Sequence, residues 1–506
     1  MKKFLTLLIL GGALSTYAQT IDDIEAFNIR DLNGSARFTA MGGAFTSLGN
    51  DISALHINPA SAAIYRKSTL GFNLGFNTST GNQSQFFGGT SNSSNFNVNL
   101  ENIGYLGTFL EGPYKQEKRY GFGISNHKIA NFDRSYAITG TNFLGAFGQG
   151  SLADYWLSNT DASGNLLGAF GLAENELLGY GLLEEYAASR AYILVPTNDT
   201  ITDVAFGTSS PGSSNIRYNR IESGSHNEFA LTFGGEASNR LSYGVSLGFP
   251  YLSYRIEDQI REFNLPTDTT PFDATSYELN RTNEISATGF NIKLGLIYKM
   301  SQWWRIGASY QSPSWYSVDQ FYELDVQSSF SDGFQGGSDV ISTGLYSYGI
   351  RTPAIYRIGT SLIAGKRGLI SVDYEYSDPT RGRTYETNNI SSISQDDLAD
   401  GNSSINSLMT SRNTLRIGAE LKMGLFFLRG GYSNQSSIYQ DGDNYRTKQT
   451  NLSGGIGFQT KKFSIDISYV NSEYGRLDYV HPFAGDNLVS TTNTSNNLII
   501  GTSIRF

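Results

Sequence analysis

The sequence contains no cysteine, and this restricts what the protein can be. A chain of 506 residues without cysteine cannot carry disulfide bonds, cysteine-ligated zinc, iron–sulfur clusters, a thiol nucleophile or a lipid on cysteine. Charged residues are also scarce, at 16% of the chain against about 25% in ordinary soluble domains. The formal net charge is −9, so we expect no basic surface for nucleic acid.

Long apolar runs are the third feature that the sequence lacks. Beyond the N-terminus, no stretch approaches the ~18 uninterrupted apolar residues of a membrane helix. Instead there are 56 Gly, 31 Tyr and 31 Phe, and aromatic residues make up 13% of the chain. Disordered chains are poor in aromatic residues, so this composition favours a folded β protein.

The N-terminus has the organisation of a secretory signal peptide. Lys2 and Lys3 precede a short apolar run at residues 4–14, and small residues at Thr16 and Ala18 precede a cleavage site. We therefore expect residues 1–18 to be a signal peptide; the alternative, an N-terminal anchor helix, would need a longer run. The mature chain is then either a soluble secreted protein or a membrane β-barrel, because only helices and closed barrels satisfy their backbone in lipid.

Strict alternation of apolar and polar residues recurs along the chain, for example at residues 293–298, 305–310 and 463–469. This period of two predicts strands with one apolar face, which a soluble sandwich would share. However, the segments are about ten residues or longer, which suits a bilayer, and aromatic residues recur at their ends. Short turns also alternate with long polar connections, as in outer-membrane barrels.

The pattern predicts fourteen strands, an even number that returns the C-terminus to the rim with the short turns. They cover residues 68–79, 95–110, 118–130, 215–237, 240–257, 283–300, 303–323, 346–364, 367–378, 410–423, 425–437, 447–460, 462–474 and 495–506. The predicted fold is an all-β transmembrane antiparallel barrel.

Two segments do not read as strands: residues 19–64 and an insertion at residues 131–214. The insertion contains a helix-like run at residues 172–191 with a rough apolar stripe. By strand parity it lies outside the cell. It is either a cap that captures hydrophobic molecules or a loop that packs on its own barrel rim.

The segment at residues 34–63 carries a set of motif residues: Arg37, Gly42, Gly43, Asp51, Asn58, Pro59 and Ala60. Together with residues 304–313 (WRIGASYQSP), this set resembles the FadL-type outer-membrane transporters of long-chain fatty acids and aromatic hydrocarbons. The resemblance covers nearly the whole mature chain, although Ser61 replaces the Gly that usually follows Asn-Pro-Ala. It implies a fourteen-stranded barrel at residues 65–506 whose lumen is plugged by an N-terminal hatch at residues 19–64.

The resemblance also implies a function and a location. The protein would be a monomeric passive transporter in the Gram-negative outer membrane, surrounded by lipid and lipopolysaccharide and without a cofactor. Hydrophobic small molecules, foremost long-chain fatty acids, would be captured by extracellular loops and released past the hatch through a lateral gap near the third strand. The same family includes PorV-like proteins of type IX secretion, so a protein-binding barrel is the alternative.

Five cations are expected on lumen-facing positions of the strands, where they could hold the carboxylate of a fatty acid while apolar side chains hold its tail. They are Lys293, Arg305, Arg357, Arg416 and Arg429. The alternative is internal pairing, because Asp373, Glu375, Glu420 and Asp466 are predicted to point inward as well. In the hatch, Asp51 could accept hydrogen bonds from the lumen cations.

No catalytic constellation stands out. Residues 244–248 match the G-x-S-x-G pattern of hydrolases, but that motif requires a strand–turn–helix, and here Ser246 lies inside an alternating strand. The four His residues are scattered and form no metal-binding motif. We therefore expect a protein that is not an enzyme and binds no metal.

Overall fold

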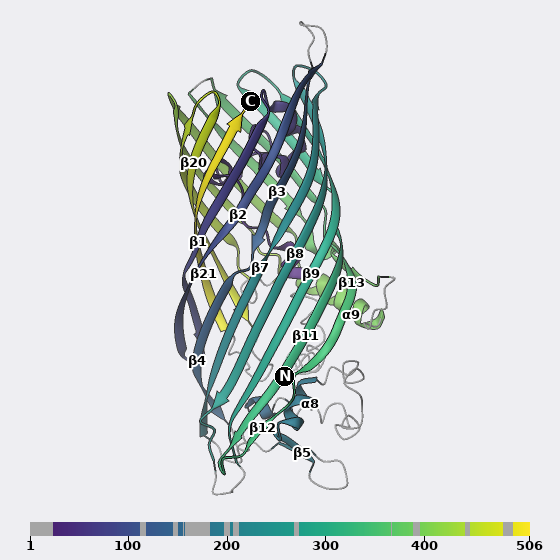
Figure 1. Ribbon diagram of the computed structural model, residues 1–506, viewed down its shortest axis with the longest axis vertical. Helices are drawn as coiled ribbons and strands as arrows, with labels where there is room; N and C mark the ends of the chain where they lie inside the picture. Colours follow the sequence, from purple (N-terminus) through teal and green to yellow (C-terminus); the bar gives the residue numbers. More distant parts are fainter. Residues whose placement is uncertain are drawn as a thin grey trace.

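The computed structural model describes residues 24–111, 118–144, 150–154, 156, 183–196, 203–205, 212–267, 273–365, 367–387, 395–440, 446–478 and 489–506. Most of these residues form one antiparallel sheet that closes on itself (Figure 1). Its first strand, β1 (Thr69–Phe86), pairs with β2 (Gly89–Glu111) on one side and with the last strand, β21 (Val489–Arg505), on the other.

Within the described residues, the wall has fourteen strands, so the prediction of a fourteen-stranded transmembrane barrel is confirmed. The other wall strands are β3 (Lys118–Asn131) continued by β4 (Arg134–Leu144), β7 (Gly212–Glu236), β8 (Leu241–Phe263), β9 (Ala274–Lys299), β10 (Trp304–Gln311) continued by β11 (Trp315–Phe330), β13 (Ile341–Arg351) continued by β14 (Ile355–Ala364), β15 (Gly368–Ser377) continued by β16 (Arg383–Tyr385), β17 (Arg412–Met423), β18 (Phe426–Gln435), β19 (Gln449–Gln459) and β20 (Phe463–Asp478). The remaining short strands are β5 (Leu194–Pro196), β6 (Asp203–Ala205) and β12 (Gln335–Gly337).

Four wall strands are interrupted. Pro313, Pro353 and Pro379 lie at three of the interruptions, where a residue without a backbone N–H cannot continue the ladder. The fourth interruption, at Phe132 and Asp133 between β3 and β4, contains no proline. The sequence therefore marks three of the four breaks, but not the one in the third strand.

Towards the short-turn rim, the outer face of the barrel is apolar and the inner face polar, as the alternation predicts. On β9, Leu294 is 50% exposed whereas its neighbour Lys293 is 1% exposed. An apolar exterior over a polar interior is the arrangement of a barrel embedded in lipid. Among the described residues, no helix is both long and apolar enough to cross a membrane.

The wall is taller on one side than on the other. β7, β8 and β9 have 25, 23 and 26 residues, whereas β17, β18 and β19 have 12, 10 and 11. The predicted strands agree with the structure to within a residue or two at the short-turn rim; at the opposite rim the strands of the tall side are predicted too short, whereas β17, β18 and β19 are predicted two residues too long. Outside the lipid the outward face need not be apolar, so the alternation weakens while the backbone ladder continues.

The largest correction concerns the third strand, which was predicted to end at residue 130. It continues as β4, which pairs with β7 along its length. The first part of the segment assigned to the insertion, residues 134–144, is therefore part of the wall.

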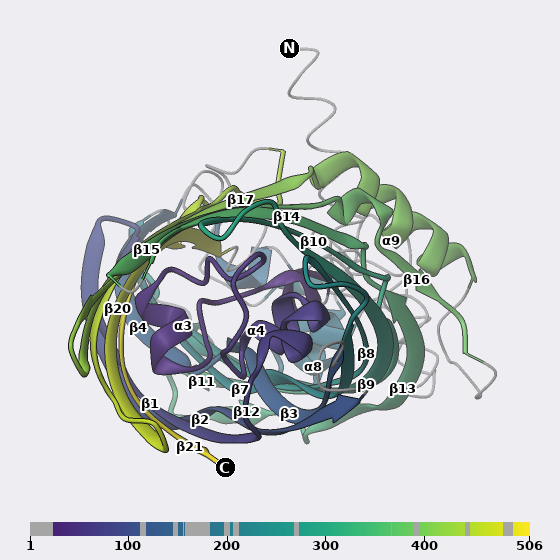
Figure 2. The same ribbon diagram turned by 90° about the horizontal axis from the view of Figure 1, so that it is seen from above.

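The N-terminal segment, residues 24–65, lies inside the barrel (Figure 2). It contains α3 (Ala36–Ala40), α4 (Ala54–Ile57) and a 3-10 helix, η1 (Pro59–Ile64). Its own apolar core consists of Phe38, Met41, Phe45, Leu48, Ala54 and Ile57. Residues 24–29 form a second apolar cluster with inward side chains of the wall further from the short-turn rim. The division into a hatch at residues 19–64 and a barrel from residue 65 remains a prediction.

A third apolar cluster lies at the long-loop end of the barrel. There α8 (Leu183–Arg190) and Trp156 pack against inward residues of the tall wall, including Tyr218 and Tyr277. Of the helix predicted at residues 172–191, only the part from residue 183 is among the described residues. This part packs on its own barrel, whereas a capturing role stays a prediction. A further helix, α9 (Gln395–Leu408), lies beside β16 (Figure 2) and the short η3 (Pro379–Arg381), and its Ile405 belongs to the same apolar cluster as residues 24–29.

A charge on the outer face should reveal the position of the lipid. Leu294 lies five residues before the end of β9, about half-way up a band roughly 25 Å tall. Leu294→Arg is expected to lower the free energy of unfolding in bilayers by about 2–4 kcal/mol, measured by urea titration. Phe143→Arg, at the far end of β4 and equally outward, should cost less than about 1 kcal/mol. Equal effects would contradict this position of the membrane.

Candidate functional site

The N-terminal segment presses directly on the backbone of the wall. Gly42 has φ 61°, and a Cβ atom there would lie 2.9 Å from the backbone N and O of Tyr432 on β18. On the opposite side, a Cβ at Gly244 of β8 would lie 2.3 Å from the carbonyl carbon of Pro59. Glycine is required at both contacts, because any side chain would push the segment off the wall. Gly43 has φ 75°, and a Cβ atom there would lie 3.0 Å from Leu32 and 3.2 Å from Phe38.

Asn58 ties the turn before η1 to both the segment and the wall. Its Nδ2 donates hydrogen bonds to the carbonyl oxygens of Thr46 at 2.7 Å and Leu296 at 3.1 Å. Its Oδ1 accepts from the backbone N–H of Ala60 at 3.0 Å, which caps η1. One side chain thus starts the helix and fixes it to β9.

The two charged motif residues of the segment have different partners. Arg37 forms a two-pronged ion pair with Glu420 of β17, with its Nε 2.9 Å from Oε2 and its Nη2 3.2 Å from Oε1. Asp51 accepts hydrogen bonds from the Ser35 hydroxyl at 2.7 Å and the Ser53 N–H at 2.9 Å. The expected hydrogen bonds from lumen cations to Asp51 are not made among the described residues. Burial raises the pKa of Asp51, an effect that the charge of Arg37 opposes.

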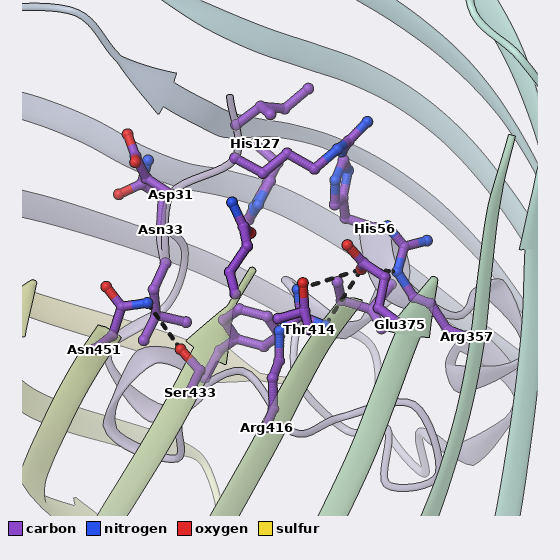
Figure 3. A pocket seen from close by; sticks show the side chains of 16 residues that line it. Asp31, Asn33, His56, His127, Arg357, Glu375, Thr414, Arg416, Ser433 and Asn451 are labelled. Carbon is purple, nitrogen blue, oxygen red and sulfur yellow. Dashed lines mark hydrogen bonds and ion pairs between the residues drawn. The ribbon is translucent and has the colours of Figure 1, made fainter. Parts of the chain in front are cut away.

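Arg357 and Arg416, two of the predicted ligand-binding cations, share one carboxylate in the lumen (Figure 3). Arg357 Nε lies 2.6 Å and Arg416 Nη1 3.2 Å from Oε2 of Glu375. The cavity beside them measures about 40 Å³ and is lined on its other sides by Asp31 and His56 of the segment and by polar wall residues. This is room for a few water molecules and not for an acyl chain.

Lys293 belongs to a separate cluster, in which it pairs with Glu228 of β7. The His56 Nδ1 lies 2.9 Å from Oε1 of Glu228 and 2.9 Å from Nζ of Lys293, so it can serve only one of them at a time. The ring of His127 on β3 stacks on His56 with centroids 4.3 Å apart. Burial, helped by the Lys293 charge, lowers the pKa of His56 to about 4, so the ring is neutral at pH 7. In the described part of the chain, no cluster of acidic and His residues could hold a metal.

The last two predicted cations differ sharply. Arg429 pairs with Glu420 at 2.7 Å and with Asp466 at 2.6 Å. Arg305 forms no ion pair with any described residue, and its guanidinium reaches only the Leu48 carbonyl at 3.4 Å. The structure therefore does not bring the five cations together into one site; four pair with carboxylates, Arg357 and Arg416 with the same one, and Arg305 pairs with none among the described residues.

The wall has a section without a backbone ladder beside the third strand. β2 pairs with β3 only from Asn102 to Glu111, and β4 pairs with β7 alone, apart from one bond from the Thr141 N–H to the Phe87 carbonyl at 3.2 Å. Side chains bridge the space between. Ser93 donates to the Ser135 carbonyl at 2.6 Å, Asn97 to Asp133 at 3.0 Å, and Lys128 to Asn99 at 2.6 Å. We call this section, from residue 89 to 101 of β2, the seam.

Ser246, the centre of the hydrolase-like pattern, lies within β8, five residues after its first residue. Its hydroxyl is 2.9 Å from that of Thr232 on β7 and is buried. A strand interior lacks the exposed turn that a nucleophile elbow requires.

Comparison with known proteins agrees with this geometry. No family model and no curated protein matches the chain. Among solved structures, a Pseudomonas aeruginosa FadL homologue matches with a TM-score of 0.52 at 10% identity, covering 94% of this chain and 99% of the other. The P. putida toluene transporter TodX matches with a TM-score of 0.51 at 15% identity, again covering 94% and 99%. The fold is that of the FadL-type barrels.

Sequence reasoning missed several residues of the lumen. Glu228 holds Lys293, and Arg412 lies 4.0 Å from Glu375 as a third arginine. Both occupy inward positions of alternating strands, and that is the only signal that the sequence offers for them. Which carboxylate meets which cation depends on strands far apart in the chain.

The contact between Gly42 and the wall can be tested against a control, Gly430, because each of these residues begins a Gly-Gly pair. Gly42→Ala is expected to loosen the N-terminal segment, because the left-handed backbone alone costs about 1–2 kcal/mol and the Cβ meets β18. The result should be a higher conductance in planar bilayers. Gly430→Ala, where no atom lies within 4 Å of the new Cβ, is the control and should leave conductance unchanged. Unchanged conductance in both would contradict the contact.

Glu375 should be essential for stability, because it is the acceptor for buried arginines. Glu375→Gln leaves these charges without a partner and is expected to cost about 3–5 kcal/mol in unfolding free energy. The matched control is Glu257→Gln, whose partner Arg255 is 2.7 Å away but 42% exposed, with an expected loss below about 1 kcal/mol. Denaturant titration in detergent compares the two; similar losses would show that Glu375 is not a central acceptor.

Proposed function

We propose that this protein is a passive transporter of the Gram-negative outer membrane for hydrophobic small molecules, with long-chain fatty acids as its main substrates. The observation that carries the proposal is the seam, an opening of the backbone ladder in an otherwise closed wall. The outer face beside it is apolar, with Phe96 and Val98 of β2 66% and 54% exposed. The fold that the chain shares with a toluene transporter and a FadL homologue supports the same reading.

The proposed route begins at the apolar cluster around Trp156 and ends at the seam. Transfer of a hydrophobic molecule from water to the apolar residues at the long-loop end lowers its free energy. It would leave sideways at the end of the seam nearest the short-turn rim, where Phe96 and Val98 face outward, which avoids a second passage through water. The lumen cavity beside Arg357 and Arg416 measures only about 40 Å³, which supports the proposal that the N-terminal segment shifts during passage and acts as a hatch.

The seam is suited to opening because side chains close it. Parting β2 from β3 and β4 along the seam breaks individual side-chain hydrogen bonds of Ser93, Asn97 and Lys128 and the one backbone bond of Thr141, whereas a pair such as β20 and β21 is joined by a continuous ladder. The fatty-acid assignment draws on the family resemblance, since four of the five lumen cations are already paired. The protein-binding alternative draws no support from the part of the chain that the structure describes.

A disulfide across the seam tests this proposal, and the absence of native cysteine makes the background clean. Asn97→Cys/Asp133→Cys replaces two side chains whose Nδ2 and Oδ2 atoms lie 3.0 Å apart across the seam. Under oxidation, uptake of a neutral hydrocarbon such as toluene is expected to fall to the level of cells without the protein, and a reductant should restore it.

The control pair lies between two strands with a continuous ladder. Ser464→Cys/Ser503→Cys joins β20 to β21, where the hydroxyls are 2.7 Å apart, and should leave uptake unchanged in either redox state. Full uptake through the locked seam would refute lateral release.

A further inference from the structure

An open vestibule lies at the short-turn rim, on the other side of the N-terminal segment from the seam. Its volume is about 560 Å³, within the range of roughly 300–1,000 Å³ that small-molecule sites occupy. The segment supplies its floor with residues 48–50, and the turns after β17 and β19 supply its walls. It is more than ten times larger than the cavity beside Glu375.

All the charged residues that line the vestibule are positive. Seven of its lining residues are cations: Arg37, Arg66, Lys67, Arg305, Lys422, Lys461 and Arg505. No Asp or Glu is among the lining residues, although the whole chain carries more acidic than basic residues. A concave site of one sign focuses the field and concentrates counter-ions.

Most of these cations lack the partners that neutralise the lumen. Only Arg37 forms an ion pair within the described residues, with Glu420. Arg505 donates to the Thr460 carbonyl at 3.3 Å, and Lys422 lies over the Phe427 ring at 5.5 Å from its centroid. Arg305, the one predicted ligand cation without a carboxylate, faces this space together with Arg66. Ion pairs with carboxylates, which most of the predicted lumen cations form, are thus rare among the cations of the vestibule.

Apolar side chains share the same wall. They are Leu48, Ile64, Ile363, Leu369, Leu425 and Phe427. A site for inorganic phosphate or another fully hydrated ion would gain nothing from these residues. A ligand with an acidic group on an apolar chain would satisfy both halves of the lining, because guanidinium groups bind carboxylates in charge-assisted pairs and the chain is removed from water.

We propose that this vestibule is a binding site for an anionic amphiphile, with Arg66 and Arg305 holding a carboxylate and the aliphatic and aromatic residues holding the first part of its chain. The inference deepens the proposed function and rests on it for the supply of ligand. It gives acidic substrates a second binding site, at the short-turn rim, that neutral hydrocarbons do not use. It also moves the carboxylate site from the lumen, where the cations are paired, to the short-turn rim.

The test measures binding to the full chain in a non-ionic detergent by calorimetry. Dodecanoate is compared with dodecanol, which has the same chain without the charge, and with acetate, which has the charge without the chain. For Arg66→Gln/Arg305→Gln we expect dodecanoate to bind about tenfold more weakly, while dodecanol is unaffected. Dodecanoate affinity for the unsubstituted protein should also fall as ionic strength rises.

The control variant removes two cations of the same rim outside the vestibule. Arg240→Gln/Lys299→Gln makes the same change in net charge on the turn side of β8 and β9, and should bind dodecanoate as the unsubstituted protein does. Equal weakening in both variants would reduce the effect to general electrostatics and overturn the inference. Unchanged binding in the vestibule variant, or acetate competing as well as dodecanoate, would overturn it as well.

The two proposals fail separately. If toluene uptake survives the locked seam while dodecanoate binding depends on Arg66 and Arg305, lateral release is wrong and the vestibule stands. If the lock blocks uptake but the vestibule variant binds dodecanoate normally, the transporter stands and the vestibule does not.

Discussion

The closed ladder of backbone hydrogen bonds is the constraint from which the rest of this structure follows. Lipid offers no partner to a backbone N–H or carbonyl, so each strand within it must be paired on both sides. The pairing of β1 with β21 meets this condition and places both ends of the wall at the short-turn rim. Fourteen strands then enclose a lumen wide enough that something must fill it.

The filling consists of layers with different chemistry. The apolar cluster around Trp156 lies at the long-loop end, and a second one around residues 24–29 lies deeper. Beyond them, carboxylates and cations of the wall meet the segment, as Glu228 meets His56 and Glu420 meets Arg37. Burying these charges without partners would cost several kcal/mol each, so their pairing is a condition of having a polar lumen at all.

The sequence predicts the wall better than its contents, for a physical reason. Alternation over residues 293–298 or 463–469 is a local consequence of lipid on one side, so strand number and the short-turn boundaries can be read directly. Where the strands leave the lipid this signal ends, and the continuation of the third strand into β4 was missed. The charge pairs could not be predicted, because Lys293 and Glu228 are 65 residues apart and meet only through the register of three strands. The inward position of both was predictable; their contact was not.

In the proposed transport route, the closure of the seam by side chains separates two properties that most channels couple. In an ordinary pore the narrowest point decides both which molecules pass and how fast they do so. Here the residues that would select a ligand line the lumen and the two ends, whereas the residues that would limit its rate of release are Ser93, Asn97 and Lys128 in the wall. On that route, single substitutions at Ser93 or Asn97 of β2, or at Lys128 of β3, would change throughput without changing specificity. A barrel of this kind can adapt to a scarce or an abundant substrate by altering a few hydrogen bonds in its wall.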